Sequence, residues 1–353
     1  MCLVNQHSGF HSLKNGLLKL VLKHLRKKLL RKNYNQTGGF RLKHKIFYSF
    51  FRKNLIIMKM RNIKESLVKI LFFLTAVSSI IIVFFIFAFL IKEGSPAFMD
   101  VGILEFVTGM KWHAPADIYG ILPLIVVSLL ITFGAMVFAV GLGVPTAIFL
   151  SEVAPNRVKI ILKPAVEMLA GVPSIVYGFI GMVLLVGYLG PTFDMLTGRS
   201  ILAGSILLGI MALPTVVSVS EDAISVVPTE FKEGSLALGA TKWQTIKTVT
   251  FPAAFSGIAA AVILGMGRAI GETMAVLLVV GNICKIPIPF FDYFETGQPL
   301  TAKIAGEMGE AGRGSLQYHA LFGVGVTLLI IVFILNLIAE VVMTRLKKKW
   351  GGV

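Results

Sequence analysis

The sequence predicts an all-α, polytopic membrane protein with six transmembrane helices, and two observations carry this prediction. Of the 353 residues, 56% are hydrophobic and only 15% are charged, with a mean hydropathy of +0.82, which is unlike ordinary soluble domains. The apolar residues also come in long runs that are almost free of charge. A helix that crosses the hydrocarbon core needs about 20 such residues. Lipid is therefore the solvent in which this chain is expected to fold.

Each apolar run defines one expected helix. In chain order the runs are residues 70–91, 118–151, 168–193, 200–220, 252–282 and 314–339. The second run is longer than a bilayer requires, and Gly141, Gly143 and Pro145 lie near its end, so we expect one long or bent helix there. The fifth run is interrupted only by Arg268 and Glu272, and we count it as one span.

The formal net charge of +16 is concentrated at the beginning of the chain. Residues 1–64 hold 16 of the 34 Lys and Arg and no Asp or Glu, so the remainder is neutral. The loops expected on the cytoplasmic side hold 10 further Lys and Arg, and the outer loops hold 6. This asymmetry places both termini in the cytoplasm by the positive-inside rule. Membrane placement explains the charge better than nucleic-acid binding does, so the expected partner is the lipid bilayer and no nucleic acid.

Three segments follow from this layout. Residues 1–62 form a basic leader, in which residues 17–32 have the composition of an amphipathic helix that lies on an anionic surface. We expect the leader to be disordered, or to be a mis-called start if translation begins at Met58 or Met60. Residues 63–117 hold the first transmembrane helix and an outer loop. Residues 118–349 form the core, with a cytoplasmic loop at 227–251.

Several kinds of catalytic and metal site find no support in the sequence. The two cysteines, Cys2 and Cys284, lack the spacing of a disulfide framework or a zinc site. The chain also lacks the G-x-x-x-x-G-K-[ST] phosphate-binding loop, H-E-x-x-H and G-x-S-x-G. We therefore predict no catalytic residue, no metal ligand and no cofactor bound by this chain.

The most specific motif lies in the loop between the fourth and fifth spans. Residues 233–239 read E-G-S-L-A-L-G, and nine residues later 249–252 read V-T-F-P. A short helix with small residues on one side, ended by a glycine, can lie in a groove of another protein. The alternative is an ordinary loop helix that packs on its own bundle. The predicted contact residues of this coupling helix are Glu233, Gly234, Ser235, Ala237, Gly239 and Ala240.

This motif resembles the E-A-A-x-x-x-G-x9-I-x-L-P loop of ABC importer permeases. Gly234 and Ser235 replace the two alanines, Val249 replaces isoleucine and Phe251 replaces leucine. Further motifs make the resemblance closer, namely Y-G-I-L-P at 119–123, A-I-F-L-S-E-V-A-P at 147–155, A-G-V-P-S-I-V-Y-G-F at 170–179, P-T-V-V-S-V-S-E-D-A at 214–223 and G-R-A-I-G-E-T-M-A-V at 267–276. From about residue 63 to residue 349 the chain is similar to the phosphate permease family of PstC type. The paired PstA type typically carries G-E-T-A-P, whereas this chain has Met274 and Ala275.

The resemblance implies a type I ABC importer permease (MetI-like) fold and a subunit of an ATP-driven phosphate importer in a bacterial or archaeal plasma membrane. It implies three kinds of partner component: a second permease of PstA type, a homodimer of PstB-type ATP-binding subunits that use ATP and Mg, and an extracytoplasmic phosphate-binding protein of PstS type. A permease for sulfate or molybdate stays open, because the residues alone do not distinguish tetrahedral anions. An intramembrane enzyme that uses Arg268, Glu272 or His319, and a phosphate-sensing scaffold, are the rival classes.

Arg268 and Glu272 would be singled out without any family resemblance. A charged residue at a helix centre costs about 2.5–3.5 kcal/mol on insertion scales, so both side chains should face protein or water. At spacing i, i+4 they can pair. A guanidinium near the middle of the membrane can offset the charge of a passing oxyanion. We predict that both residues line the substrate pathway and that Glu272 holds Arg268 in place; the alternative is a structural ion pair between helices.

The remaining conspicuous residues are predicted to be structural. Gly267 and Gly271 form a small-x-x-x-small step that lets another helix approach. Proline interrupts or bends membrane helices, which is the role expected of Pro173 and Pro214, and Pro252 closes the loop motif. Glu221 and Asp222, at the inner end of the fourth span, are expected to form a solvated helix end, with gating or pairing to lysines of the coupling loop as the alternatives.

Overall fold

The computed structural model describes residues 39–350, with side chains described for residues 65–345. The expected amphipathic helix at 17–32 lies outside the described residues. The chain divides into two compact units, Met1–Val83 and Phe84–Val353. Helix α2 (Gly39–Ala97) begins in the first unit and ends in the second, and it includes residues 39–62 of the predicted leader. All the sites described below lie in the second unit.

Six helical segments of the described chain are long and apolar enough to cross a membrane, as predicted. They are Glu65–Thr108, Leu122–Val153, Ser174–Thr192, Ile201–Ser225, Lys242–Ile270 and Leu316–Arg345. The helices that follow α2 are α3 (Ile103–Thr108), α4 (Leu122–Ile148), α5 (Asn156–Ala170), α6 (Ser174–Ile180), α7 (Gly187–Thr192), α8 (Ile201–Ser225), α9 (Thr229–Ala237), α10 (Lys242–Thr245), α11 (Phe251–Ile270), α12 (Met274–Val279), α13 (Leu300–Glu307) and α14 (Leu316–Trp350).

Short π-helical turns join several of these helices, and one small sheet lies among them. The π turns are η1 (Phe98–Gly102), η3 (Phe149–Val153), η4 (Gly181–Val186) and η5 (Ile246–Thr250), and η2 (Ala114–Ala116) is a 3-10 turn. Strands β1 (Trp112–His113) and β2 (Ile118–Tyr119) pair antiparallel, with Trp112 opposite Tyr119. The second span is one long helix, as expected, because η3 continues α4 without a gap.

Two of the predicted spans are broken. The third apolar run divides between α5 and α6 at residues 171–173, because Pro173 lacks an N–H group and disfavours the helical conformation of the residue before it. The prediction of one helix over 252–282 is wrong, since α11 ends at Ile270 and α12 begins at Met274. Glycine is a poor helix former, and Gly271 is the C-cap of α11. By contrast, Pro214 lies inside α8, which continues past it to Ser225.

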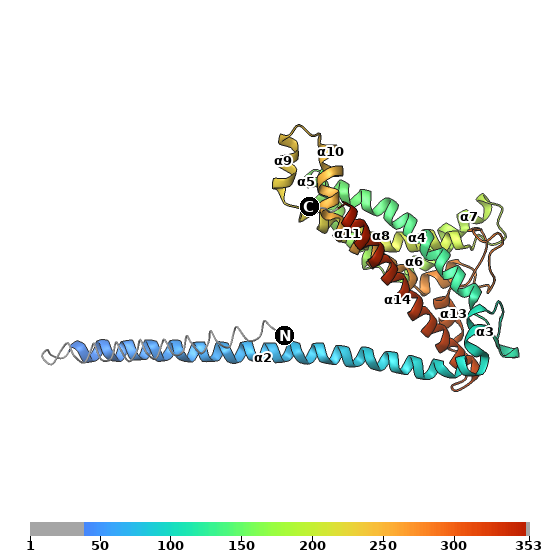
Figure 1. Ribbon diagram of the computed structural model, residues 1–353, viewed down its shortest axis with the longest axis horizontal. Coiled ribbons are helices and arrows are strands. Elements are labelled where there is room, and N and C mark those ends of the chain that lie inside the picture. Colours follow the sequence, from blue (N-terminus) through green and yellow to red (C-terminus); the bar gives the residue numbers. More distant parts are fainter. Residues whose placement is uncertain (1–38, 351–353) are drawn as a thin grey trace. The chain divides into compact units, whose positions relative to one another are not determined.

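The centre of the second unit consists of α4, α8 and α11, which pack on one another. Figure 1 shows these helices running together, with α9 and α10 at one end of the unit and α3 and α13 at the other. The main apolar core lies between α4, α8, α12 and the third span and includes Ile131, Leu208 and Val279. This core holds in place the helices that carry Arg268 and the loop with α9.

The segments at 92–117 and 283–316, which the sequence assigns to the outer side, contact each other through side chains. Trp112 Nε1 donates a hydrogen bond to Glu307 at 2.9 Å, and Gln317 donates to the same carboxylate at 3.2 Å. Lys303 is only 5% exposed; it pairs with Glu307 at 2.5 Å and lies 4.9 Å from the centre of the Trp112 ring. These contacts satisfy a buried ammonium group, which would otherwise be costly. They join α13 to β1 at the end of the unit opposite α9 and α10 (Figure 1).

We expect Gly134→Ala to destabilise the protein, because α4 and α8 meet at this glycine. A Cβ at position 134 would lie 2.7 Å from the Cβ of Ser205, whereas a Cβ at Gly141 on the same helix would meet nothing within 4 Å. Overpacking at position 134 should lower the free energy of unfolding by about 1–3 kcal/mol. Thermal unfolding in detergent tests this, with Gly141→Ala as the control. Equal melting temperatures for the two variants would contradict the close approach of α4 and α8.

Candidate functional site

The two helix breaks meet around Arg268. This residue lies in the last turn of α11 and is half-buried. Its Nη2 atom donates a hydrogen bond to the carbonyl oxygen of Ala170 at 3.4 Å, and Ala170 is the last residue of α5. The guanidinium is therefore held against the α5–α6 break. Discontinuous helices line substrate and ion sites in many transporters, because irregular backbone at membrane depth is tolerated where it lines a cavity.

Glu272 lies in the break between α11 and α12 and is also half-buried. Its Oε1 accepts a hydrogen bond from the N–H of Thr273 at 3.0 Å, and its carbonyl oxygen accepts one from the hydroxyl of Thr301 at 2.8 Å. The ion pairs found among the described residues do not include one between Arg268 and Glu272. The prediction that they pair is wrong, because α11 ends at Ile270 and the two residues do not share a helical turn.

Tyr177 fixes the α5–α6 break from the other side. Its side chain is buried, and its hydroxyl donates to the carbonyl oxygen of Leu169 across the break at 2.8 Å. One residue later, Gly178 packs against α12, where a Cβ would lie 2.8 Å from the Cα of Ala275. The sequence reasoning missed Tyr177, although it lies in the motif at 170–179. Both breaks are thus held by side chains and close backbone contacts.

The arrangement leaves Arg268 able to bind an anion. A guanidinium has five N–H donors, and the structure shows one bond from Arg268 to a carbonyl. A Cβ at Gly267 would meet nothing within 4 Å, and at Gly271 it would meet only the carbonyl of Gly267 at 3.4 Å. The predicted approach of another helix to these glycines is therefore not made by any described part of this chain. The surface beside Arg268 remains open to a partner subunit or a solute.

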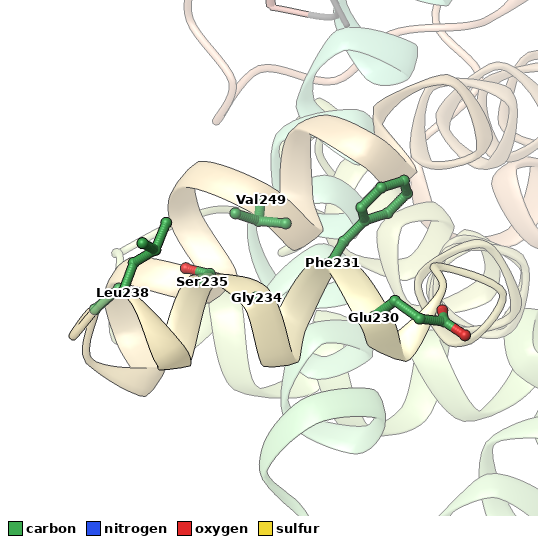
Figure 2. A pocket seen from close by; sticks show the side chains of 7 residues that line it. Glu230, Phe231, Gly234, Ser235, Leu238 and Val249 are labelled. Carbon is green, nitrogen blue, oxygen red and sulfur yellow. The ribbon is translucent and has the colours of Figure 1, made fainter.

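The predicted coupling helix is α9, which begins after Pro228 and ends where Gly239 adopts a φ of +86°. Glycine adopts this left-handed conformation without steric cost, so its place after the helix confirms the predicted helix end. Figure 2 shows an open hollow beside α9, with Phe231 from α9 and Val249 from η5 on its wall. The hollow has a volume of about 430 Å³.

Large apolar side chains project from this loop into solvent. Leu238 is 89% exposed, Trp243 67% and Phe231 56%. Phe231 and Leu238 lie outside the candidate spans, and Trp243 is the second residue of one. Exposed apolar groups of this kind are typical of a contact with a protein or a membrane. Sequence reasoning missed them, although large apolar residues in a loop between two spans were a usable signal.

The predicted contact residues divide into two sets. Exposed positions are Glu233, Gly234, Ala237 and Gly239, whereas Ser235 and Ala240 are half-buried. The Ser235 hydroxyl lies 3.0 Å from the hydroxyl of Thr245, so this side chain joins α9 to α10. The exposed set remains available to a partner, and the half-buried set shapes the loop.

Ion pairs connect α9 with η3, and α5 with the end of α8. Lys232 on α9 pairs with Glu152 of η3 at 2.6 Å. Glu221 is 1% exposed and pairs with Lys159 at 2.6 Å and Lys163 at 2.5 Å, both on α5. The expectation of a solvated helix end is therefore wrong for Glu221, and its lysine partners lie on α5 rather than in the coupling loop. Hydrogen bonds to Glu221 and to the neighbouring Asp222 raise the pKa of Lys163, which keeps it charged.

Comparison with known proteins identifies the family. Residues 142–352 match the family described as "Binding-protein-dependent transport system inner membrane component". The Bacillus subtilis protein named "Probable ABC transporter permease protein YqgH" is 42% identical over 264 residues, which cover 73% of this chain and 84% of that protein. The Mesorhizobium japonicum protein named "Phosphate transport system permease protein PstC" is 33% identical over 267 residues, which cover 70% of this chain and 80% of that protein.

A solved structure resembles the fold. It is titled "Crystal structure of a bacterial ABC transporter involved in the import of the acidic polysaccharide alginate". The match has a TM-score of 0.52 and 16% identity, and it covers 74% of this chain and 92% of the other. With six spans and a matching family, the expected type I ABC importer permease fold is confirmed. The chain belongs to the binding-protein-dependent transport system inner membrane components, and within them to the PstC-type permeases.

Proposed function

We propose that this chain is the PstC-type transmembrane subunit of an ATP-driven phosphate importer and that Arg268 lies on the phosphate pathway. The observation that carries the proposal is the half-buried guanidinium at the meeting of two broken helices, beside glycines that no described helix covers. A planar guanidinium binds tetrahedral oxyanions through paired hydrogen bonds. Its bond to the Ala170 carbonyl can be exchanged for bonds to an anion. Glu272, 4 positions later in the chain, adds a negative charge that limits how long the anion stays.

The pathway requires a second permease, of PstA type. The face that carries Leu264 and Met274 beside Arg268 is exposed in this chain. A partner that covers this face would enclose the guanidinium and exclude lipid from it. Gly267 and Gly271 would let that partner approach closely, which is the role that the sequence assigned to them.

The energy for transport comes from a partner that hydrolyses ATP. This partner binds at the end of the unit that carries α9 and α10, opposite α13. The exposed apolar side chains of α9 and α10 form a surface that suits a groove on a PstB-type ATP-binding subunit, present as a homodimer that uses ATP and Mg. This chain supplies no cofactor site of its own in the proposal. Both termini and α9 lie on the cytoplasmic side, and a PstS-type phosphate-binding protein docks at the other side. ATP binding closes the two ATPases, moves the coupling helices and opens the pathway outward, and hydrolysis resets it.

Uptake of labelled phosphate by vesicles tests the proposal. The vesicles hold the complete complex, with ATP on the α9 side and the binding protein on the other. We expect uptake to require both, and unlabelled phosphate to abolish it while the same excess of sulfate or molybdate does not. Uptake of labelled sulfate in place of phosphate, or uptake without ATP, contradicts the assignment.

A further inference from the structure

Helix α5 connects the two functional regions and yet is weakly packed. It runs along α8 and beside η3. None of its 15 residues, all of which are described, is buried. Ile160, Ile161 and Met168 are more than two-thirds exposed, and Leu162 and Leu169 are about two-fifths exposed. Because apolar burial contributes little here, polar contacts must decide where α5 sits on the bundle.

The polar contacts come from one buried carboxylate. The side chain of Glu221 is 2% exposed and is flanked by the ammonium groups of Lys159 and Lys163. The second lysine also reaches the exposed Asp222 at 2.9 Å. A buried carboxylate is stable only with compensating charge, and removing one partner of a buried ion pair is strongly destabilising. This lysine cluster therefore fastens α5 to the inner end of α8.

The two ends of α5 lead to different sites. Its last residue, Ala170, accepts the hydrogen bond from Arg268. Its first residues follow η3, where Glu152 pairs with Lys232 of α9 at 2.6 Å. Two sets of ion pairs therefore lie along this path. A carboxylate of η3 pairs with a lysine of α9, and lysines of α5 pair with carboxylates at the end of α8. A displacement of α9 would thus be transmitted to the helix that holds the guanidinium.

We propose that Glu221, with Lys159 and Lys163, positions Arg268 by fixing α5. The inference rests on the proposed function, in which Arg268 meets phosphate and α9 meets the ATPase. While Lys159 and Lys163 are paired with Glu221, the Ala170 carbonyl accepts a hydrogen bond from the Arg268 guanidinium. When α9 draws η3 and α5 away, the guanidinium is released to the anion. The cluster thereby links the state of the motor to the affinity of the pathway for phosphate.

The first test measures the position of α5 directly in the assembled complex. Spin labels are placed on the exposed sites Ile161→Cys and Val226→Cys, with Cys2→Ser and Cys284→Ser removing the native thiols. We expect a narrow distance distribution between α5 and the end of α8. Glu221→Gln should broaden or shift it, and Arg157→Met should not, because Arg157 is exposed on α5 and makes no ion pair with any described residue. An unchanged distribution in Glu221→Gln overturns the inference.

The second test measures coupling by a double-mutant cycle. Glu221→Gln should lower phosphate uptake per ATP hydrolysed by about 10-fold, with no additional loss when it is combined with Arg268→Lys, because residues that act through one another are not additive. Lys163→Arg, which keeps the charge, should retain more uptake than Lys163→Met. A merely structural role would reduce the amount of complex and leave this ratio unchanged. Losses in the ratio that multiply in the double variant would mean that Glu221 and Arg268 act independently. Either result overturns the positioning role.

The same experiment separates the inference from the proposed function. If Arg268→Lys itself leaves uptake unchanged, the pathway role of Arg268 is contradicted. The distance distributions then still decide whether the lysine cluster fixes α5, since they do not depend on transport.

Discussion

Phosphate uptake by the complete complex will fall on the order of 100-fold when Arg268 is replaced by alanine. A hydrogen bond to a charged group contributes about 1.5–3 kcal/mol, and each 1.4 kcal/mol corresponds to a factor of about 10. An oxyanion that crosses this point would lose at least one such bond, along with the compensating charge. Arg268→Lys keeps the charge but not the planar pair of donors, so its loss should be smaller, about 10-fold.

The Arg268 variants must be compared at equal amounts of assembled complex. ATP hydrolysis should persist in Arg268→Ala, because Arg268 contacts Ala170 and no residue of α9 among the described contacts. Arg157→Ala is the matched control, since this arginine is exposed on α5. Initial rates of labelled phosphate uptake measure the effect. Normal uptake by Arg268→Ala would remove the guanidinium from the pathway and leave the helix breaks as structural features only.

The spans were predictable because the thickness of the bilayer sets a minimum length for each uncharged run that crosses it. The same local logic located the end of α9, since a glycine with a positive φ is a common helix end. Helix breaks follow a different rule. The break after Ile270 contains no proline, and within it the Glu272 carbonyl accepts a hydrogen bond from Thr301, which lies 29 positions away in the chain. Local sequence cannot reveal such a partner.

The candidate site was predictable in its residue types and not in its partners. An arginine inside an apolar run signals function wherever it occurs. Its observed partner is a backbone carbonyl, which every residue possesses, so no sequence pattern marks Ala170. Glu221 illustrates the same limit, because its position at the end of a span suggested solvent and its partner Lys163 lies 58 positions earlier. Exposure likewise depends on tertiary packing, so the sequence could place Leu238 and Trp243 near a loop but could not show that they are exposed.

Recruitment of the ATP-binding subunit will weaken on the order of 30-fold when Leu238 is replaced by aspartate. Leu238 is 89% exposed, so the substitution removes little packing within this chain. In a docked complex the same side chain would be buried, and truncating an interface hot spot costs about 2 kcal/mol or more. A carboxylate in an apolar groove adds its own desolvation cost. Co-purification and titration of the ATPase onto the permease pair measure the loss.

Leu196→Asp is the matched control for this substitution. Leu196 has a relative exposure of 106% and lies between α7 and α8, on the side assigned to the binding protein. Both variants place one carboxylate on a fully exposed leucine, so they differ only in which face of the membrane receives the charge. ATPase recruitment should fall for Leu238→Asp alone. Equal recruitment by the two variants would mean that the apolar surface of α9 serves another contact, and the coupling role would then have to lie elsewhere in the loop at 227–251.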